Sequence, residues 1–250
     1  MTKKIFVPMK ANNMPVQSPL VPEPMVPYSC KNSMTVFAMC EVDPDTVRKH
    51  LSSTPFEYVS NLCQVYVNNF LESPELPYMD SGIIFTVKYK DQYGGYYMYE
   101  WEDDDVAIAT GRIWGYPKKY AAMTLDKKGD LVHGYTERKG TRLIDIEVDL
   151  SKPVENLPKL QATYPHLNLL TIARPDGPGI LTQMVTARDN SSSCKLLSIQ
   201  YGEAKVKLQC SATDPIGDFE PVKVLGGGYS VTDFLAGSDN GWAKIVDKLI

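Results

Sequence analysis

Hydrophobic residues fall into many short runs along the chain, and most of these runs predict β-strands. Residues 34–41 are almost all apolar, and residues 142–150 alternate between apolar and polar side chains as a half-buried strand does. Residues 106–111, which precede a pair of lysines, form another apolar run that we interpret as a strand. We predict further strands at residues 62–69, 82–90, 96–102, 168–173, 181–188, 195–201 and 204–210.

Signals for helices are few. Asp43-Pro44-Asp45 is typical of a helix start, with Asp43 as the N-cap and Pro44 at the first helical position. We also predict helices at residues 231–235 and 242–250, and a hairpin turn at residues 92–95. Many short strands with few helices predict a mainly β (α+β) fold, in which mostly antiparallel strands close into a barrel.

Prolines are concentrated at the beginning of the chain, within residues 1–31. Each proline removes a backbone donor and restricts the residue before it, so we predict an extended arm over this range. The arm is expected to lie across its own domain or across a neighbouring subunit. Residues 32–250 show no internal repeat and no low-complexity linker, and they are predicted to form a single domain.

Composition and charge narrow the possible functions. A net charge of −4 gives no general affinity for nucleic acid, which needs clustered lysine and arginine. No apolar run reaches the roughly 20 residues of a membrane span, and the N-terminus lacks a secretory signal, so we expect a cytoplasmic protein. The five cysteines form no CxxC pair and the three histidines are scattered, which predicts free thiols and no metal site.

The candidate chemistry lies at Lys118 and Lys119, which follow Tyr116-Pro117. A lysine with the ordinary pKa of about 10.4 is almost fully protonated at neutral pH, so a nucleophilic lysine needs a lowered pKa. Burial and a nearby positive charge both lower this pKa. Since adjacent residues on an extended chain point to opposite sides, we expect burial of Lys118 to be the larger effect. The alternative is a solvated turn that carries both lysines.

The run from Gly111-Arg112 to Tyr116-Pro117-Lys118-Lys119 resembles the acetoacetate decarboxylase superfamily, whose signature is Gly-Arg followed by an aromatic residue and Pro-Lys-Lys. The resemblance extends from about residue 28 to residue 249 and includes Asp176-Gly177-Pro178 and Asp214-Pro215. It implies a barrel-like fold of that type and an enzyme that forms a lysine Schiff base. Acetoacetate decarboxylase is itself the known example of a lysine activated in this way.

By this resemblance, Lys118 is the Schiff-base lysine and Lys119 is the neighbour that helps to keep it neutral. Asp80 falls where the family commonly has a glutamate before Ser-Gly, and Tyr78 lies two residues earlier on the same face of a strand. We therefore predict four catalytic residues: Lys118, Asp80, Lys119 and Tyr78.

Gln64, Arg112 and Tyr116 are the predicted substrate-binding residues. Arg112 is expected either to hold a carboxylate in the pocket or to form a structural ion pair. Decarboxylases of the family carry a second pocket glutamate where this chain has Gln64 or its neighbour Val65, and an arginine where it has Ser33. These departures favour aldol condensation and dehydration of pyruvate over decarboxylation of acetoacetate or another 3-oxo acid, which is the alternative.

The resemblance further implies a lyase without a cofactor, acting on a small oxo acid with an aldehyde as a possible co-substrate, and a homo-oligomer. A non-enzymatic alternative is a barrel that binds an apolar ligand, with Lys118 at its mouth. We interpret the acidic run at residues 102–105 as a solvated loop, and the aromatic residues between 93 and 101 as packing residues.

Overall fold

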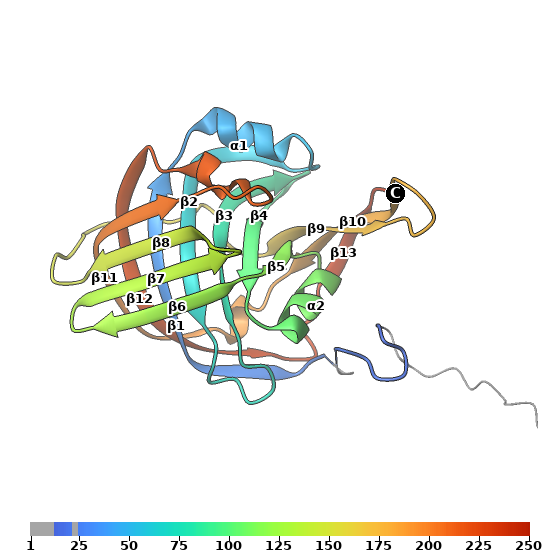
Figure 1. Ribbon diagram of the computed structural model, residues 1–250, viewed down its shortest axis with the longest axis horizontal. Helices are drawn as coiled ribbons and strands as arrows, with labels where there is room; N and C mark the ends of the chain where they lie inside the picture. The colour runs from blue at the N-terminus through green and yellow to red at the C-terminus, as the bar shows by residue number, and fades with distance from the viewer. Residues whose placement is uncertain (1–12, 22–24) are drawn as a thin grey trace, which may run out of the picture.

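Thirteen strands form one large, strongly curled sheet in the computed structural model, which describes residues 13–21 and 25–250 (Figure 1). The strands are β1 (Tyr28–Glu41), β2 (Glu57–Asn69), β3 (Met79–Tyr89), β4 (Gln92–Glu102), β5 (Lys118–Tyr120), β6 (Ala122–Lys128), β7 (Leu131–Arg138), β8 (Thr141–Asp149), β9 (His166–Ala173), β10 (Ile180–Arg188), β11 (Lys195–Leu208), β12 (Lys223–Ala236) and β13 (Lys244–Lys248). The other regular elements among the described residues are two α-helices, α1 (Pro44–Leu51) and α2 (Asp105–Ile113), and two short 3-10 helices, Ser191–Ser193 and Pro215–Phe219.

The sheet is open, so the predicted closure into a barrel is wrong, whereas the mainly β class with mostly antiparallel pairs is confirmed. The strand order runs β13-β10-β9-β4-β3-β2-β1-β12-β11-β8-β7-β6, and β5 pairs with β4 beside this path. β9 joins β4 in parallel through the single pair Gly95 and His166. The strands β9, β10 and β13 therefore leave the curl to one side, as Figure 1 shows, and do not meet β6.

The main core lies inside the curl, between the first strands and the β6–β8 layer. Val36 of β1 and Val67 of β2 pack against Val132 of β7 and Ile146 of β8, and all four are buried. Gly134 of β7 allows this close packing, because a Cβ there would lie only 2.4 Å from a methyl group of Val36. Side chains on one face of β1 and β2 thus pack in the core, and the alternate side chains on the opposite face can line a site.

The predicted start of α1 is confirmed, because the Asp43 side chain accepts a hydrogen bond from the Thr46 amide at 2.9 Å. The strand predicted at residues 106–111 is wrong, since this run lies in α2. Asp104 caps α2 by accepting a hydrogen bond from the Ala107 amide at 2.8 Å. A helical register then buries Ala107 together with Gly111, one turn later.

Three other local predictions need correction. Residues 231–235 belong to β12 and residues 242–250 include β13, so neither segment is helical. β12 is paired along its length with β1 and β11, and this pairing outweighs local helical preference. The hairpin turn lies at Lys90 and Asp91, before the predicted residues 92–95, because β4 begins at Gln92.

Part of the predicted arm at residues 1–31 lies outside the described residues, namely residues 1–12 and 22–24. In the described part, Val21 and Met25 pack against Trp114 and Tyr116. The division into an arm and one domain at residues 32–250 stays a prediction, as does the homo-oligomer. Among the described helices, none has the length and apolar character that crossing a membrane requires.

Candidate active site

A cavity of about 470 Å³ lies on the face of the sheet opposite the core. Phe37 and Met39 of β1 line it, while Val36 and Ala38, which alternate with them, point into the core. α2, the segment 157–164 and the end of β10 cover the other side. Its volume lies within the range of roughly 300 to 1,000 Å³ that is usual for small-molecule sites.

Lys118 lies at the wall of this cavity and is only 7% exposed. It belongs to β5, which runs parallel to β4 with Lys118 opposite Glu100. The ammonium donates a hydrogen bond to Glu102 and lies 3.5 Å from Oε1 of Glu100. The alkyl chain passes directly over Gly111 of α2, where an added Cβ would lie 2.1 Å from Cε of Lys118. The glycine of the Gly-Arg signature thus leaves room for the lysine.

A bulge in β4 brings Glu100 to the cavity. Ile83 pairs with Tyr99 and Ile84 pairs with Tyr97, so Met98 is an extra residue on β4. This extra residue shifts the alternation of side chains, and Tyr97 and Glu100 both face the cavity. Without the bulge, residues 97 and 100 would point to opposite faces.

Asp80 completes a cluster of three buried carboxyl groups with Glu100 and Glu102. Asn68 donates a hydrogen bond to Asp80 at 2.7 Å. One oxygen from each carboxyl group lies within 4.8 Å of the others, which is close enough for all three to contact one cation. The Lys118 ammonium is such a cation, since it pairs with Glu100 and Glu102.

The ionisation of this cluster differs from the prediction. Burial acts to lower the pKa of Lys118, but Glu100, Glu102 and Asp80 together raise this pKa above the ordinary lysine value. Burial also raises the pKa of Glu100, raises that of Glu102 well above its usual range, and raises that of Asp80 to about 7. The expected lowered pKa of Lys118 is therefore wrong, because the carboxylates outweigh desolvation.

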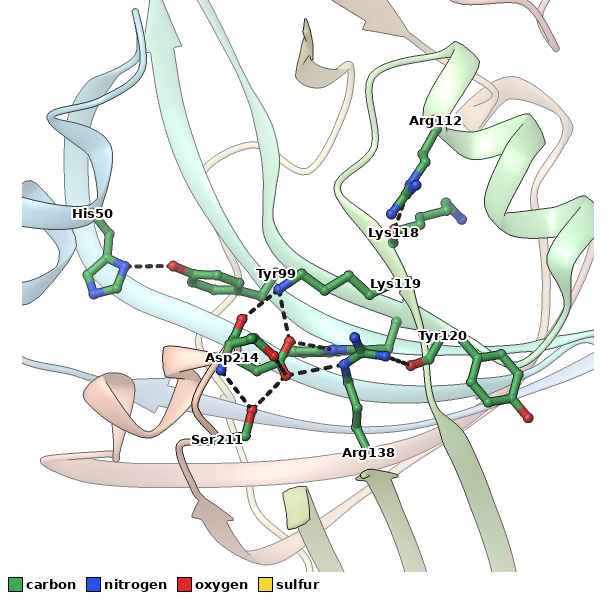
Figure 2. A network of polar contacts seen from close by, with 11 residues as sticks. His50, Tyr99, Arg112, Lys118, Lys119, Tyr120, Arg138, Ser211 and Asp214 are labelled. Carbon is green, nitrogen blue, oxygen red and sulfur yellow. Dashed lines mark hydrogen bonds and ion pairs between the residues drawn. The ribbon is translucent and has the colours of Figure 1, made fainter. Parts of the chain in front are cut away.

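Lys119 points away from the cavity, as the alternation along an extended strand requires (Figure 2). Its ammonium lies 2.9 Å from Oδ1 of Asp214 and donates to the carbonyl of Thr213. Asp214 also accepts hydrogen bonds from Arg138 and Ser211. Lys119 therefore supports the outer side of β5, and it does not supply a charge beside the Lys118 amine.

Arg112 is exposed and does not line the cavity. Its Nε donates to the main-chain carbonyl of Lys118 at 2.9 Å (Figure 2). Of the two roles predicted for Arg112, the structure shows no pocket contact and no ion pair among the described residues. Arg112 instead ties α2 to β5 from outside.

The other predicted site residues, Tyr78, Gln64 and Tyr116, all line the cavity. The Lys118 ammonium lies 5.8 Å from the ring centre of Tyr78 and 5.2 Å from that of Tyr116. Burial raises the pKa of Tyr116 to about 12 and that of Tyr78 well above its usual range, so both phenols are neutral at pH 7.

The cavity residues that were not predicted from the sequence include the ionisable residues Glu100, Glu102, His166 and Arg188. The two glutamates did carry a signal, because acids at i and i+2 in an aromatic strand imply a buried polar face. We interpreted Glu102 as part of a solvated loop, and that interpretation is wrong, since its side chain is fully buried. Arg188 ends a predicted strand, and no local pattern connects it with Lys118.

Comparisons with known proteins place the chain in a family. The family model of acetoacetate decarboxylase matches residues 13–244. An acetoacetate decarboxylase of Burkholderia cenocepacia is 27% identical over 237 residues, which cover 91% of this chain and 92% of that protein.

Two solved structures share the fold. An acetoacetate decarboxylase structure has a TM-score of 0.83 at 19% identity and covers 97% of this chain and 98% of its own. The enduracididine biosynthesis enzyme MppR, solved with pyruvate, has a TM-score of 0.75 at 16% identity, covering 95% and 97%. MppR has also been solved with the condensation product of pyruvate and imidazole 4-carboxaldehyde. At these identities the likeness concerns the fold alone.

Proposed function

The chain belongs to the acetoacetate decarboxylase family, and we propose that it is a lyase in which Lys118 forms a Schiff base with a small oxo acid. The observation that carries this proposal is the position of the Lys118 amine, buried at a cavity wall among three carboxyl groups. A ketone bound in this cavity would lie beside the amine, and the amine is already in contact with carboxyl groups that can accept and donate protons.

Glu102 is the group that we assign to activate Lys118. The ammonium already donates a hydrogen bond to this carboxylate, and moving that proton leaves a neutral amine and a carboxylic acid. In a buried site a neutral pair costs less, relative to the ion pair, than it does in water. The raised pKa of Glu102 agrees with its acting as the proton acceptor.

The amine, the ketone and Glu102 then supply all the atoms and protons that Schiff-base formation requires. The amine nitrogen attacks the ketone carbon, and the carbonyl oxygen takes a proton to give a carbinolamine. Glu102 returns a proton to the hydroxyl group, which leaves as water, and a protonated imine remains. This imine draws electrons from the neighbouring carbon, so a proton or a carboxylate on that carbon becomes a good leaving group.

We favour condensation and dehydration as the reaction that follows. Loss of a proton from the carbon beside the imine gives an enamine, which attacks an aldehyde, and loss of water then gives an unsaturated imine. A water molecule hydrolyses this imine, which releases the unsaturated oxo acid and returns the Lys118 amine. These steps need a group that both accepts and donates protons, and Asp80, with a pKa of about 7, has both forms near neutral pH. The cavity of about 470 Å³ has room for two small reactants. MppR, which shares the fold, has been solved with pyruvate and with a condensation product of pyruvate and an aldehyde, which supports this choice.

Decarboxylation of a 3-oxo acid is the second candidate. A substrate carboxylate placed beside Asp80, Glu100 and Glu102 is repelled, and its departure as neutral carbon dioxide relieves that repulsion. The relative from Burkholderia cenocepacia carries this activity in its name. Binding of an apolar ligand without catalysis is the least favoured function, since buried ionisable groups that include Asp80, Glu100, Glu102 and Lys118 line the cavity and oppose apolar binding.

The test combines product analysis with covalent capture. The protein is incubated with pyruvate and an aromatic aldehyde, and separately with acetoacetate, while conjugated product and carbon dioxide are measured. Borohydride is then added, and the labelled residue is located by peptide mass. We expect conjugated product and a label on Lys118. Rapid release of carbon dioxide without condensation supports the second candidate, and the absence of any label on Lys118 refutes both.

A further inference from the structure

The cavity carries opposite charges at its two ends. The carboxyl groups of Asp80, Glu100 and Glu102 surround Lys118 at one end. Arg188 of β10 lies at the other end and is only 6% exposed. The ring of Tyr116 lies between the two, with one face 5.2 Å from the Lys118 ammonium and its hydroxyl group near the Arg188 guanidinium.

Arg188 is held rigidly by neutral groups. Its Nε donates to the carbonyl of Gly241 at 2.7 Å, and its Nη2 donates to the hydroxyl of Tyr28 at 2.9 Å. The guanidinium carbon lies 4.2 Å from the centre of a Trp114 ring, which is a cation–π contact. The side chain is therefore preorganised and would lose little conformational freedom on binding a ligand.

No carboxylate among the described residues forms an ion pair with Arg188. Its phenolic neighbour Tyr116 is neutral at pH 7, with a pKa of about 12. His166, which hydrogen-bonds Tyr116, is also neutral, because burial and then Arg188 lower its pKa to about 3. Glu100 is near enough for Arg188 to help lower its pKa, but the two form no ion pair. A buried cation without a directly paired counter-charge is costly, and an anion that enters with a ligand would reduce this cost.

A second donor in this region also has no acceptor. Within the described part of the chain, the indole Nε1 of Trp114 is buried and makes no hydrogen bond, although Trp114 is in contact with the Arg188 guanidinium. Buried donors are almost always paired in folded proteins. Trp114 and Arg188 both line the cavity, so the unpaired indole donor and the unpaired cation lie close together on its wall.

We propose that Arg188 binds a carboxylate of the substrate that is remote from the carbonyl carbon attacked by Lys118. This inference rests on the proposed function for the role of Lys118, and it refines the substrate class: pyruvate is then a minimal substrate, and the preferred oxo acid carries a carboxylate separated from the attacked carbonyl by a carbon chain. A carboxylate bonded directly to the imine carbon remains at the Lys118 end, among three carboxyl groups, and does not reach past Tyr116 to Arg188. A singly charged carboxylate also matches the single charge of Arg188 better than a phosphate dianion, which would leave one charge unpaired.

The experiment uses borohydride capture at Lys118 as a measure of occupancy. Levulinate and its longer homologues place a carboxylate at increasing distance from a methyl ketone, and a neutral ketone of the same chain length is the reference for each. We expect half-maximal capture at a concentration roughly tenfold or more lower for the best oxo acid than for its neutral reference. Equal concentrations for each pair in the unmodified protein overturn the inference, whatever the behaviour of the variants.

Variants then assign the preference to Arg188. Arg188→Gln should remove the preference for the acid while leaving capture of the neutral ketone, and Arg188→Lys should retain part of it because the charge remains. Lys159→Gln is the matched control, since Lys159 lines the same cavity but is exposed. A preference that Arg188→Gln leaves intact, or that Lys159→Gln removes, contradicts the assignment.

Pentanoate separates failure of this inference from failure of the proposed function. It has a carboxylate but no ketone, so its binding, followed by calorimetry, requires no Schiff base. One outcome is that no ketone is captured at Lys118, while pentanoate binds and Arg188→Gln weakens its binding. This outcome supports the carboxylate site and refutes the Schiff base. If ketones are captured but neither acid preference nor pentanoate binding depends on Arg188, the Schiff base stands and the carboxylate site falls.

Discussion

The two faces of β5 place adjacent lysines in opposite surroundings. On the outer face, Lys119 pairs with Asp214, and this aspartate is fully buried and accepts further hydrogen bonds from Arg138, Ser211 and Thr213. Both oxygens of Asp214 are therefore satisfied. Figure 2 shows this network on the side of the strand away from the Lys118 ammonium.

On the cavity face, the carboxyl groups are only partly satisfied. Oε2 of Glu100 and Oε2 of Glu102 are buried and form no hydrogen bond with any described residue. Asp80 keeps one hydrogen bond, from Asn68. A saturated network fixes a structure, whereas a buried network with free acceptors retains the capacity to take up protons and ligands. The difference indicates that the outer face holds β5 in place, and it supports the proposal that the cavity face performs the chemistry.

The strongest test of this contrast is to remove each lysine in turn. Lys118→Met should lower turnover by roughly 10⁴-fold or more, because it removes the nucleophile itself. Lys119→Met should keep most of the turnover and the capture at Lys118, but should lower the stability, since it leaves the buried Asp214 with one cation fewer. Steady-state kinetics and urea unfolding of both variants provide the measurements. Similar losses of turnover in the two variants would show that the faces are not functionally distinct.

Local sequence signals predicted those elements that depend on neighbouring residues. The cap of α1 at Asp43 and the alternation of β8 could be read directly, and so could the opposite directions of Lys118 and Lys119. β12 and β13 could not, because their strand conformation depends on partners distant in the chain. The start of α2 at Asp104 is a local cap like that of α1, but the apolar run at residues 106–111 was interpreted as a strand.

The site was predicted only in part. Lys118, Asp80, Tyr78, Gln64 and Tyr116 all reach the cavity. Glu100 was missed because the direction of its side chain depends on the bulge at Met98. Regular alternation along a strand does not predict such a bulge. Arg188 was missed because its position beside the cavity depends on tertiary pairing. Its strand, β10, pairs with β9, and β9 is joined to β4 by a single parallel bridge. The resemblance supplied the proposed nucleophile, and the tertiary structure supplied the charges around it.

The stability of the protein should depend on pH in opposite ways through Asp80 on the cavity face and Asp214 on the outer face of β5. The pKa of Asp80 is about 7 in the folded protein and about 3.9 in the unfolded chain. Between pH 4 and 7 the unfolded chain loses this proton while the folded protein keeps it, so stability falls as the pH rises through this window, on the order of 1.4 kcal/mol for each unit of pKa difference. Asp80→Asn should reduce this fall, measured as the free energy of unfolding in urea from pH 3 to 8.

Asp214 should show the opposite dependence. Burial acts to raise its pKa, but hydrogen bonds from Lys119, Ser211 and Thr213 lower the pKa below the usual range. The stabilisation from Asp214 is therefore complete above about pH 4 and is lost as the pH falls below it. Asp214→Asn should be most destabilising at neutral pH and least at acid pH. Parallel stability curves for Asp80→Asn and Asp214→Asn would contradict the contrast between the two faces.

The smallest expected effect concerns the fit of Lys118 over Gly111. In a helix, alanine is favoured over glycine by about 1 kcal/mol, so Gly111→Ala should not lower the stability of α2 by itself. The added Cβ would nevertheless lie 2.1 Å from Cε and 2.2 Å from Cδ of Lys118, and the side chain must move. A displacement of about 1 Å can cost up to 10²-fold, so we expect turnover to fall roughly tenfold to a hundredfold with little change in melting temperature.

Gly177→Ala is the matched control for this substitution, because a Cβ at Gly177 meets no atom within 4 Å and the backbone there is not in the left-handed region. It should leave both turnover and stability unchanged. The pKa of the captured amine offers a second measurement, since moving Lys118 away from Glu102 weakens the contact that raises this pKa. The pH profile of borohydride capture should therefore shift in Gly111→Ala and not in Gly177→Ala. Unchanged turnover together with an unchanged profile in Gly111→Ala would mean that the cavity face tolerates movement of its lysine, as the outer face is expected to do.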